Sequence, residues 1–453
     1  MGWWGRYAYP LVAVVLCTAS LSPASAQRVR LGPTISPGAP PTEADRNASV
    51  ALTSKQQPPA PPPVTASLEE DSGRQVSNVR SGSAVQPLIA WRKGRFTIVP
   101  YGIGWLHAAY DTSRTAAGPF VLFVHSEDTQ GEPSFSVSAR ATRLGFKIDG
   151  PPIRGGRSGG RIEFDFHGFA LTENRTGVLL RHAYGEFFRD GWHILGGQTW
   201  DLISPLYPNV LNYTVAWAAG NIGYRRAQVR IERTVQTERG GRWLVQGSLN
   251  RTIVSDFVGA PDIQGEDAGW PTLMGRVAYV APDLYGRGQP AQLGLSGHVA
   301  EHGTDFRSPP VEDDRRFLSW SLNVDVRYPL SERCGIQGEF FVGQALGTFL
   351  GGINQGIDPV EREPIRAMGG WCELWWYWTD TLHSHCGFGI DDPNDEDLSL
   401  GRRTQNHFYF ANVIWNVSPE LEVGVELSWW ETRYRGLAPG ETFRVEAAMR
   451  YHF

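Results

Sequence analysis

The chain has 453 residues, of which 41% are hydrophobic and 12% aromatic, and its formal net charge is −5. A mean hydropathy of −0.29 excludes a membrane protein built from many apolar helices. No stretch of about 18 apolar residues follows the first 30 positions. The small net charge does not indicate a nucleic-acid partner, and four Cys in this length do not make a disulfide scaffold.

The first 26 residues have the three parts of a secretory signal peptide. Arg6 supplies the positive charge, residues 11–19 form a short apolar core, and residues 24–26 match a small-residue cleavage site. A lipid-modified Cys17 is the alternative, which the bulky residue before it disfavours. We therefore expect residues 1–26 to be a signal peptide.

Residues 27–90 have a different composition. Five Pro lie between positions 58 and 63, and no aromatic residue occurs within 27–90. Such a segment buries too little apolar surface to fold by itself, and its Pro content favours an extended spacer. We expect a disordered, Pro-rich periplasmic linker, which is either inert or an arm that reaches the cell wall or a partner.

From Arg95 to the last residue, apolar and polar side chains alternate with a period of two. The end of the chain shows this clearly, because Phe443, Val445, Ala447, Met449, Tyr451 and Phe453 alternate with mostly polar residues. Alternation gives each strand one apolar and one polar face. Strands of about 9–11 residues, when tilted, span a bilayer.

The number and spacing of these strands predict a closed barrel over residues 91–453. Sixteen are expected, at 96–110, 135–149, 160–171, 180–189, 193–201, 223–234, 243–253, 271–281, 290–300, 316–328, 335–346, 366–378, 382–390, 403–416, 421–433 and 442–453. In the second, a bulge near Thr142 would bring its two halves into phase. Tight turns alternate with long connections, which is typical of an all-β outer-membrane barrel. Sixteen strands leave an aqueous lumen.

If the apolar residues face lipid, the charged residues line the lumen. The cations expected there are Arg143, Lys147, Arg161, Arg226, Arg230, Arg276, Arg327, Arg444 and Arg450. The acids expected there are Glu163, Asp165, Glu232, Asp325, Glu339, Glu373, Glu422, Glu426 and Glu446. Arginine holds carboxylates in a fixed fork, so the cations favour small anionic solutes. The alternative is that opposite charges simply pair.

The connection 202–222 is unusually apolar for a surface loop. Leu206, Tyr207, Tyr213 and Trp217 lie in it, and so apolar a loop needs cover. We expect it to fold into the barrel as a constriction; packing on a neighbouring subunit is the alternative. Arg226 and Arg230, just below it, are expected to form the cationic side of the narrowest zone, unless Glu232 neutralises one of them.

An acidic loop, a pair of histidines and a pair of cysteines are candidates for specific chemistry. The acidic loop 391–402 is expected to be solvated rather than to bind a divalent cation, and His383 with His385 lacks a third metal ligand. Cys372 and Cys386 flank the turn at 379–381 at similar distances, so they are the expected disulfide if any bond forms. No nucleophile or phosphate-binding motif occurs, and we expect no enzyme activity, cofactor or metal.

Three segments resemble the motifs of DcaP-like porins, which are trimeric outer-membrane proteins. They are LRHAYGEF (180–187), GGQTWDLISPLYPNVLNYTVAWAAGNIGYRRAQVR (196–230) and GGWCELWW (369–376). The resemblance implies a sixteen-stranded trimeric channel for small, often carboxylated, anions. It matches Arg225, Arg226 and Arg230 to the family's basic run. Family members carry an N-terminal coiled coil, whereas residues 27–90 here have no heptads.

We therefore expect an outer-membrane channel for passive diffusion of small hydrophilic solutes, with a preference for anions such as carboxylates. Its expected partners are outer-membrane lipid, two further copies of the chain and small anionic solutes. The alternatives are a structural tether that holds the cell wall through the Pro-rich arm, and a plugged receptor. A plug would need a globular domain before the barrel, which residues 27–90 cannot form.

Overall fold

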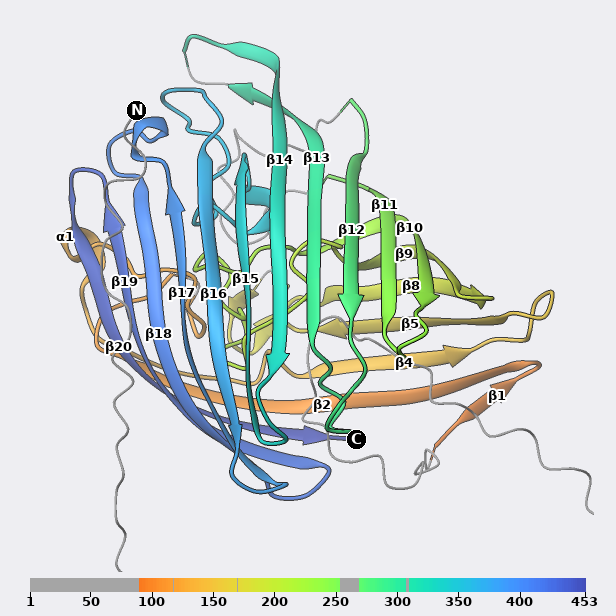
Figure 1. Ribbon diagram of the computed structural model, residues 1–453. Helices are drawn as coiled ribbons and strands as arrows, with labels where there is room; N and C mark the ends of the chain where they lie inside the picture. Colours follow the sequence, from red (N-terminus) through yellow and green to blue (C-terminus); the bar gives the residue numbers. More distant parts are fainter. Residues whose placement is uncertain (1–88, 117, 169, 253–268, 307–308) are drawn as a thin grey trace, which may run out of the picture. The chain divides into compact units, whose positions relative to one another are not determined.

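Sixteen long antiparallel strands form one closed sheet in the computed structural model, which describes residues 89–116, 118–168, 170–252, 269–306 and 309–453. Each strand is bonded to the next along the chain, and β2 (Phe96–Asp111) closes the sheet against β20 (Leu437–His452) (Figure 1). The predicted barrel is confirmed. The expected signal peptide, and all but the end of the expected linker, lie outside the described residues.

The strand bounds follow the alternating segments closely. The others are β3 (Ser134–Ser138), β4 (Arg143–Asp149), β5 (Arg157–Asp165), β8 (Leu179–Arg189), β9 (Trp192–Trp200), β10 (Arg225–Gln236), β11 (Arg242–Asn250), β12 (Thr272–Val280), β13 (Gln292–Phe306), β14 (Glu312–Pro329), β15 (Cys334–Gln344), β16 (Arg366–Tyr377), β17 (Leu382–Pro393), β18 (Arg403–Asn416) and β19 (Leu421–Tyr434). The connection expected at 301–315 is shorter than predicted, because β13 and β14 extend into it.

The second barrel strand is interrupted as predicted. His107 of β2 pairs with Ser138 of β3, and Ile103 of β2 pairs with Arg143 of β4. One strand thus advances by four residues and the other by five, so one extra residue is accommodated between Ser138 and Arg143. This is the bulge that reverses the phase of the alternation.

Little of the described chain is helical. Helix α1 (Glu127–Gln130) is capped by Ser126, and the short 3-10 turns η2 (Gly347–Phe349) and η3 (Asp395–Asp397) lie in connections. A small hairpin of β6 (Ala170–Thr172) and β7 (Arg175–Thr176) lies between β5 and β8. None of the described helices is long and apolar enough to cross a membrane.

The two faces of the barrel wall differ as the alternation requires. On β20, Val445 and Met449 are 39% and 44% exposed on the outside, while Arg444 and Glu446 are at most 1% exposed on the inside. The same division holds along the other long strands. An apolar outer face with a charged inner face fits a wall that separates lipid from the lumen.

The seam between β2 and β20 is closed by backbone hydrogen bonds, and the short strand β1 pairs with the part of β2 that extends beyond it. The amide of Gly102 donates to the Phe453 carbonyl at 2.9 Å, and the Phe453 amide donates to the Gly102 carbonyl at 3.1 Å. Before Gly102, β2 runs past the end of β20, and there β1 (Trp91–Lys93) pairs with Phe96–Ile98. Pro100 lies between these two pairings and offers no backbone donor, which suits an edge position.

The predicted disulfide is wrong in this structure, where Cys372, Cys386 and Cys334 are all free. The register pairs Cys372 with Phe388, and Cys386 with Leu374. The two thiols are therefore diagonal rather than opposite neighbours, and diagonal positions are roughly 7–8 Å apart. The register centres the turn on residue 380, within the expected turn, but Cys372 lies eight positions before that centre and Cys386 only six after it.

Candidate functional site

The connection 201–224 runs through the barrel interior, where almost every residue of it is buried. Leu206, Tyr213 and Trp217 are at most 7% exposed, and Tyr207 packs beside them. Trp217 lies over Tyr213 and Tyr224 at 6.4 and 5.5 Å between ring centroids. The apolar side chains thus cover one another on the inner side of the barrel wall. That this segment narrows a conducting path stays a prediction.

Three carboxylates of the opposite wall hold this segment by its backbone. The amide of Leu206 donates to Glu339 of β15 at 2.6 Å, and that of Leu211 donates to Glu426 of β19 at 2.8 Å. Between them, Asn209 donates its backbone amide and its side-chain amide to Glu373 of β16, at 2.5 and 2.8 Å. We call Glu339, Glu373 and Glu426 the anchor carboxylates. Their role is to fix the loop rather than to face solute.

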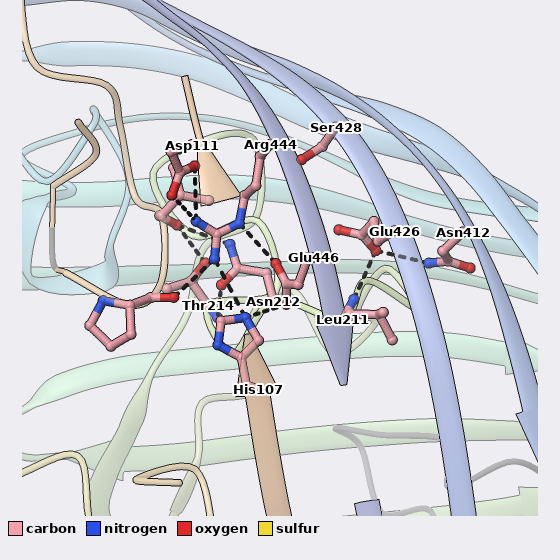
Figure 2. Close-up of polar contacts among 12 residues, drawn as sticks. His107, Asp111, Leu211, Asn212, Thr214, Asn412, Glu426, Ser428, Arg444 and Glu446 are labelled. Carbon is pink, nitrogen blue, oxygen red and sulfur yellow. Dashed lines mark hydrogen bonds and ion pairs between the residues drawn. The ribbon is translucent and has the colours of Figure 1, made fainter. Parts of the chain in front are cut away.

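An asparagine side chain and two histidines make polar contacts with the anchor carboxylates Glu426 and Glu373. Asn412 donates to Glu426 at 2.9 Å (Figure 2). It also donates to the Asn209 carbonyl at 2.7 Å. His385 Nδ1 lies 2.7 Å from Glu373 Oε1, and His383 Nδ1 lies 2.8 Å from His385 Nε2. The two histidines expected to share the lumen therefore form a chain that ends on an anchor. No group of three or more potential metal ligands occurs among the described residues.

A second inward segment, 112–126, is held by the charge cluster in Figure 2. Arg444 of β20 donates to both oxygens of Asp111 at 3.0 and 2.8 Å and to Glu446 at 2.9 Å. Its remaining nitrogen donates to the Pro119 carbonyl at 2.9 Å. His107 Nε2 lies 2.6 Å from Glu446. Arg444 lines the interior as predicted, but its charge is balanced by two acids.

The two inward segments are joined to each other and to a third. Thr214 donates its hydroxyl to the Val121 carbonyl at 2.7 Å. The amides of Ala218 and Gly223 donate to the carbonyls of Leu350 and Phe349, at 2.9 and 2.8 Å. The third segment, 345–365, is thereby part of the constriction, and its residues 345–357 are mostly buried.

The third segment also rests on inward and loop carboxylates. Asp391 accepts the amides of Gly352 and Ile353 at 3.1 and 3.0 Å. Asp358 accepts the amides of Val360, Glu361 and Ser399, each at 2.9 Å. Two acids of the region 391–402 therefore bind groups of other segments: Asp391 is buried and holds residues 352 and 353, and Asp397 pairs with Arg366 at 2.6 Å.

A cationic cluster lies on β4, β5 and β8 beside the first segment. Glu163 lies 2.7 Å from Arg161, 2.7 Å from Arg181 and 3.4 Å from Arg143. Asp165 pairs with Arg181 at 2.9 Å and accepts the Tyr213 hydroxyl at 2.7 Å. Three arginines therefore share two carboxylates, and the constriction loop is bonded to the cluster through Tyr213.

Arg225 adds a fourth cation without adding an acid. Its side chain lies over the rings of Trp200 and Tyr224, at 4.6 and 4.8 Å from the centroids, and the residue is 2% exposed. Among the described residues, none accepts a hydrogen bond from its three guanidinium nitrogens. Its electrostatic neighbours include Arg181 and Asp165. The interior at this level therefore carries more positive than negative charge.

The two arginines expected to form the cationic side of the narrowest zone, Arg226 and Arg230, have other partners. Arg226 donates to both oxygens of Asp201 at 3.1 and 3.0 Å and to the Thr348 carbonyl at 2.6 Å, and it lies 3.8 Å from the Phe349 ring centroid. Its side chain has no exposed surface, so it joins two inward segments and does not touch the lumen. Arg230 binds Gln228 at 2.9 Å and Glu232 at 3.3 Å, which is the neutralisation named as the competing expectation.

The remaining predicted lumen residues are distributed around the wall. Arg276 is paired with Asp325 at 2.8 Å, and Arg450 with Glu422 at 2.6 Å. Arg327 donates to Gln337 at 3.0 Å. Lys147 is exposed, and its amine lies 5.9 Å from the Tyr101 ring centroid. The structure thus brings opposite charges together, as the alternative reading allowed.

Several interior residues were missed from the sequence. Arg181 follows a register shift in β8, which a strict alternation cannot locate. The apolar character that identified 202–222 also marks 119–124 and 345–353, through Phe120, Leu122, Phe349 and Leu350. The same criterion applied to every connection would have found both segments.

No protein-family model matches the chain, and no curated protein matches it. The outer membrane channel DcaP of Acinetobacter baumannii has a similar structure, with a TM-score of 0.64 and 18% identity over 80% of this chain and 99% of that chain. An anion-selective porin from Comamonas acidovorans gives a TM-score of 0.51 and 13% identity over 79% and 100% of the two chains. OmpT of Vibrio cholerae gives a TM-score of 0.50 and 8% identity, over 81% of this chain and 100% of that chain. The resemblance seen in the sequence motifs is confirmed for the fold: the chain has the sixteen-stranded architecture shared with the DcaP channel.

Proposed function

We propose that the protein is an outer-membrane porin that lets small hydrophilic solutes diffuse passively and favours small anions such as carboxylates. The closed barrel with an apolar outer face supports the membrane placement. The neighbours in fold support the channel assignment, since they are outer-membrane channels and one is named as anion-selective. Like DcaP-type porins, the chain is proposed to act as a homotrimer.

The observation that carries the anion preference is the unpaired Arg225 within a group of four arginines and two acids. A guanidinium stays charged at every accessible pH, and because Arg225 is only 2% exposed, its charge acts on passing anions through the electrostatic potential rather than through contact. In a narrow zone with low-dielectric walls, an excess charge raises the local concentration of counter-ions. The other interior arginines contribute less, because acids of the wall already neutralise them.

The test is the reversal potential of the protein in planar bilayers under a salt gradient. The wild type is expected to prefer anions, and Arg225→Gln is expected to lower the anion-to-cation permeability ratio severalfold. Arg225→Lys is the matched control: it keeps the charge but not the fork, so it retains the sign of the preference. A cation-preferring wild type, or an Arg225→Gln ratio equal to that of the wild type, contradicts the assignment.

A second measurement separates the channel from its selectivity. Proteoliposomes containing the full chain are expected to swell in small sugars and faster in small dicarboxylates. Absence of swelling in both, with the barrel folded, would favour the structural tether instead of a channel.

A further inference from the structure

The short-turn end of the barrel has an uneven charge distribution. The turns of the arc from β1 to β11 comprise residues 91–96, 149–157, 189–192 and 236–242, and they contain eight cations and three acids. The turns of the remaining arc comprise residues 280–292, 329–334, 377–382 and 416–421, and they contain two cations and four acids. One side of this rim is therefore basic and the other mildly acidic.

Six cations of the basic arc form no ion pair with any described residue: Arg92, Lys93, Arg95, Arg154, Arg157 and Arg239. All six are exposed. The opposite arc has only two cations, Arg287 and Arg333, and Arg287 is paired with Asp380 at 2.9 Å. Surface cations are ordinarily interspersed with acids, so a run of unpaired cations on one arc provides a surface for a polyanion.

The topology places these cations next to one another. Strands β2, β4, β5, β8, β9, β10 and β11 are consecutive in the sheet. Neighbouring strands are about 4.8 Å apart, so adjacent turns lie roughly 10 Å from each other and the whole arc spans roughly 30 Å. That turn spacing is close to the screening length of about 8 Å at physiological salt. An extended polyanion can therefore contact several of the cations at once.

The position of the arc distinguishes a polymer from the lipid surface. Trp192 and Trp243 are exposed on the outer face at the first residues after their turns, where an aromatic girdle marks the membrane interface. Arg154 and Arg239 lie in the turns beyond that level. Arg157 points to the inner face, with its guanidinium 5.3 Å from the Phe188 ring centroid. Lipid head groups outside the barrel do not reach that inner face.

We infer that the basic arc, Arg92 to Arg239, is a docking surface for the carboxylate-bearing peptides of the cell wall. Short turns of outer-membrane barrels face the periplasm, and the wall is the extended polyanion on that side. Each exposed ion pair contributes little, but several contacts on one polymer reinforce each other. The inference rests on the membrane placement proposed above, and it assigns wall contact to the barrel itself rather than to the Pro-rich arm.

The experiment is co-sedimentation of the purified full chain with purified wall sacculi. The wild type is expected to sediment with sacculi at low salt, to lose binding as salt rises, and to lose it on sacculi whose carboxylates have been amidated. A variant carrying Arg92→Gln, Lys93→Gln, Arg95→Gln, Arg154→Gln and Arg239→Gln is expected to bind at least tenfold more weakly. The matched control is Arg287→Gln with Arg333→Gln on the opposite arc, which is expected to bind as the wild type does.

Three results would overturn the inference. The first is a five-substitution variant that is folded and binds sacculi as the wild type does, which would assign binding to the arm that both proteins carry. The second is undiminished binding to amidated sacculi. The third is binding to anionic phospholipid vesicles, but not to sacculi, through the same residues. Since sedimentation needs no conductance, failure here leaves the channel assignment to its own test.

Discussion

Removal of one anchor carboxylate should loosen the constriction without unfolding the barrel. Glu373→Ala deletes the acceptor of two hydrogen bonds from Asn209, at 2.5 and 2.8 Å. Hydrogen bonds to a charged group contribute roughly 1.5–3 kcal/mol each, so the loop loses about 3–6 kcal/mol of attachment. Glu339 and Glu426 still hold Leu206 and Leu211, and we therefore expect the lower end of that range.

Amide hydrogen exchange of the loop measures this change directly. About 3 kcal/mol corresponds to roughly a hundredfold faster exchange if the amides exchange through local opening. Peptides that cover residues 203–212 should show it, and peptides from β12 to β14 should not. Glu373→Gln keeps one acceptor oxygen and should give an intermediate rate. Single-channel conductance of Glu373→Ala should rise as the loop leaves the lumen more often.

The control is Glu232→Gln, which changes another inward carboxylate whose partners, His193 and Arg230, belong to the wall. It should leave the exchange of residues 203–212 unchanged. If Glu373→Ala forms a folded barrel and its loop exchanges as slowly as that of the wild type, the anchor carboxylates do not hold the constriction.

Three further outcomes follow from the structure. Gly102→Val should lower the thermal stability of the barrel, because a Cβ there would lie 2.4 Å from the Phe453 ring and 2.9 Å from a backbone carbonyl. The change should appear as a lower temperature of heat-modifiable gel migration. Gly104→Ala, whose Cβ would have its nearest contact at 3.9 Å, should leave that temperature unchanged. Cys372 and Cys386 should both react with a maleimide in detergent without prior reduction, and an intact-protein mass two units low would contradict this. Burial raises the pKa of Asp358, but its hydrogen bonds from Glu361, Ser399 and Val360 outweigh burial and hold that pKa below its ordinary value. The stabilisation that Asp358 gives to the segment 345–365 is therefore complete above about pH 4 and is lost as the pH falls through the lower folded pKa. Amide exchange of this segment should accelerate only in strong acid. Unchanged exchange down to about pH 2 would refute the role of Asp358.

The barrel could be predicted from the sequence because a lipid-facing wall imposes a period of two on every strand. Where that period is interrupted, the prediction depends on local signals. The bulge before Arg143 was visible because the apolar residues change phase within one strand. The register shift beside Arg181 was not, since His182 follows it with a side chain that is also polar and buried.

The inside of the barrel was predicted less well, because its contacts join residues that are far apart in the chain. Alternation correctly placed Glu373 and Glu426 on the inner face, but nothing local shows that backbone amides of a loop more than 160 positions away would meet Glu373. The same limit applies to Arg225 and Arg226. The alternation along β10 selected Arg226 as the inward cation. It is Arg225, at the end of β10 where the loop begins, whose guanidinium has no hydrogen-bond acceptor among the residues that the structure describes.

The pairing of β2 with β20 also bears on how the protein assembles. Asp111 and Arg444 are separated by 333 positions, so the charge cluster of Figure 2 cannot form until the two ends of the sheet meet. The loop-closure entropy of such a contact has to be overcome before its interactions can compensate for it. Until that moment Asp111 lacks its arginine, and the only charged partner of Arg444 in this cluster is Glu446 of its own strand. An apolar environment strongly disfavours the unpaired charge of Asp111. Closure therefore joins the last hydrogen-bonded ladder and neutralises these buried charges in one step, so the barrel should insert as a nearly complete cylinder rather than as an open sheet.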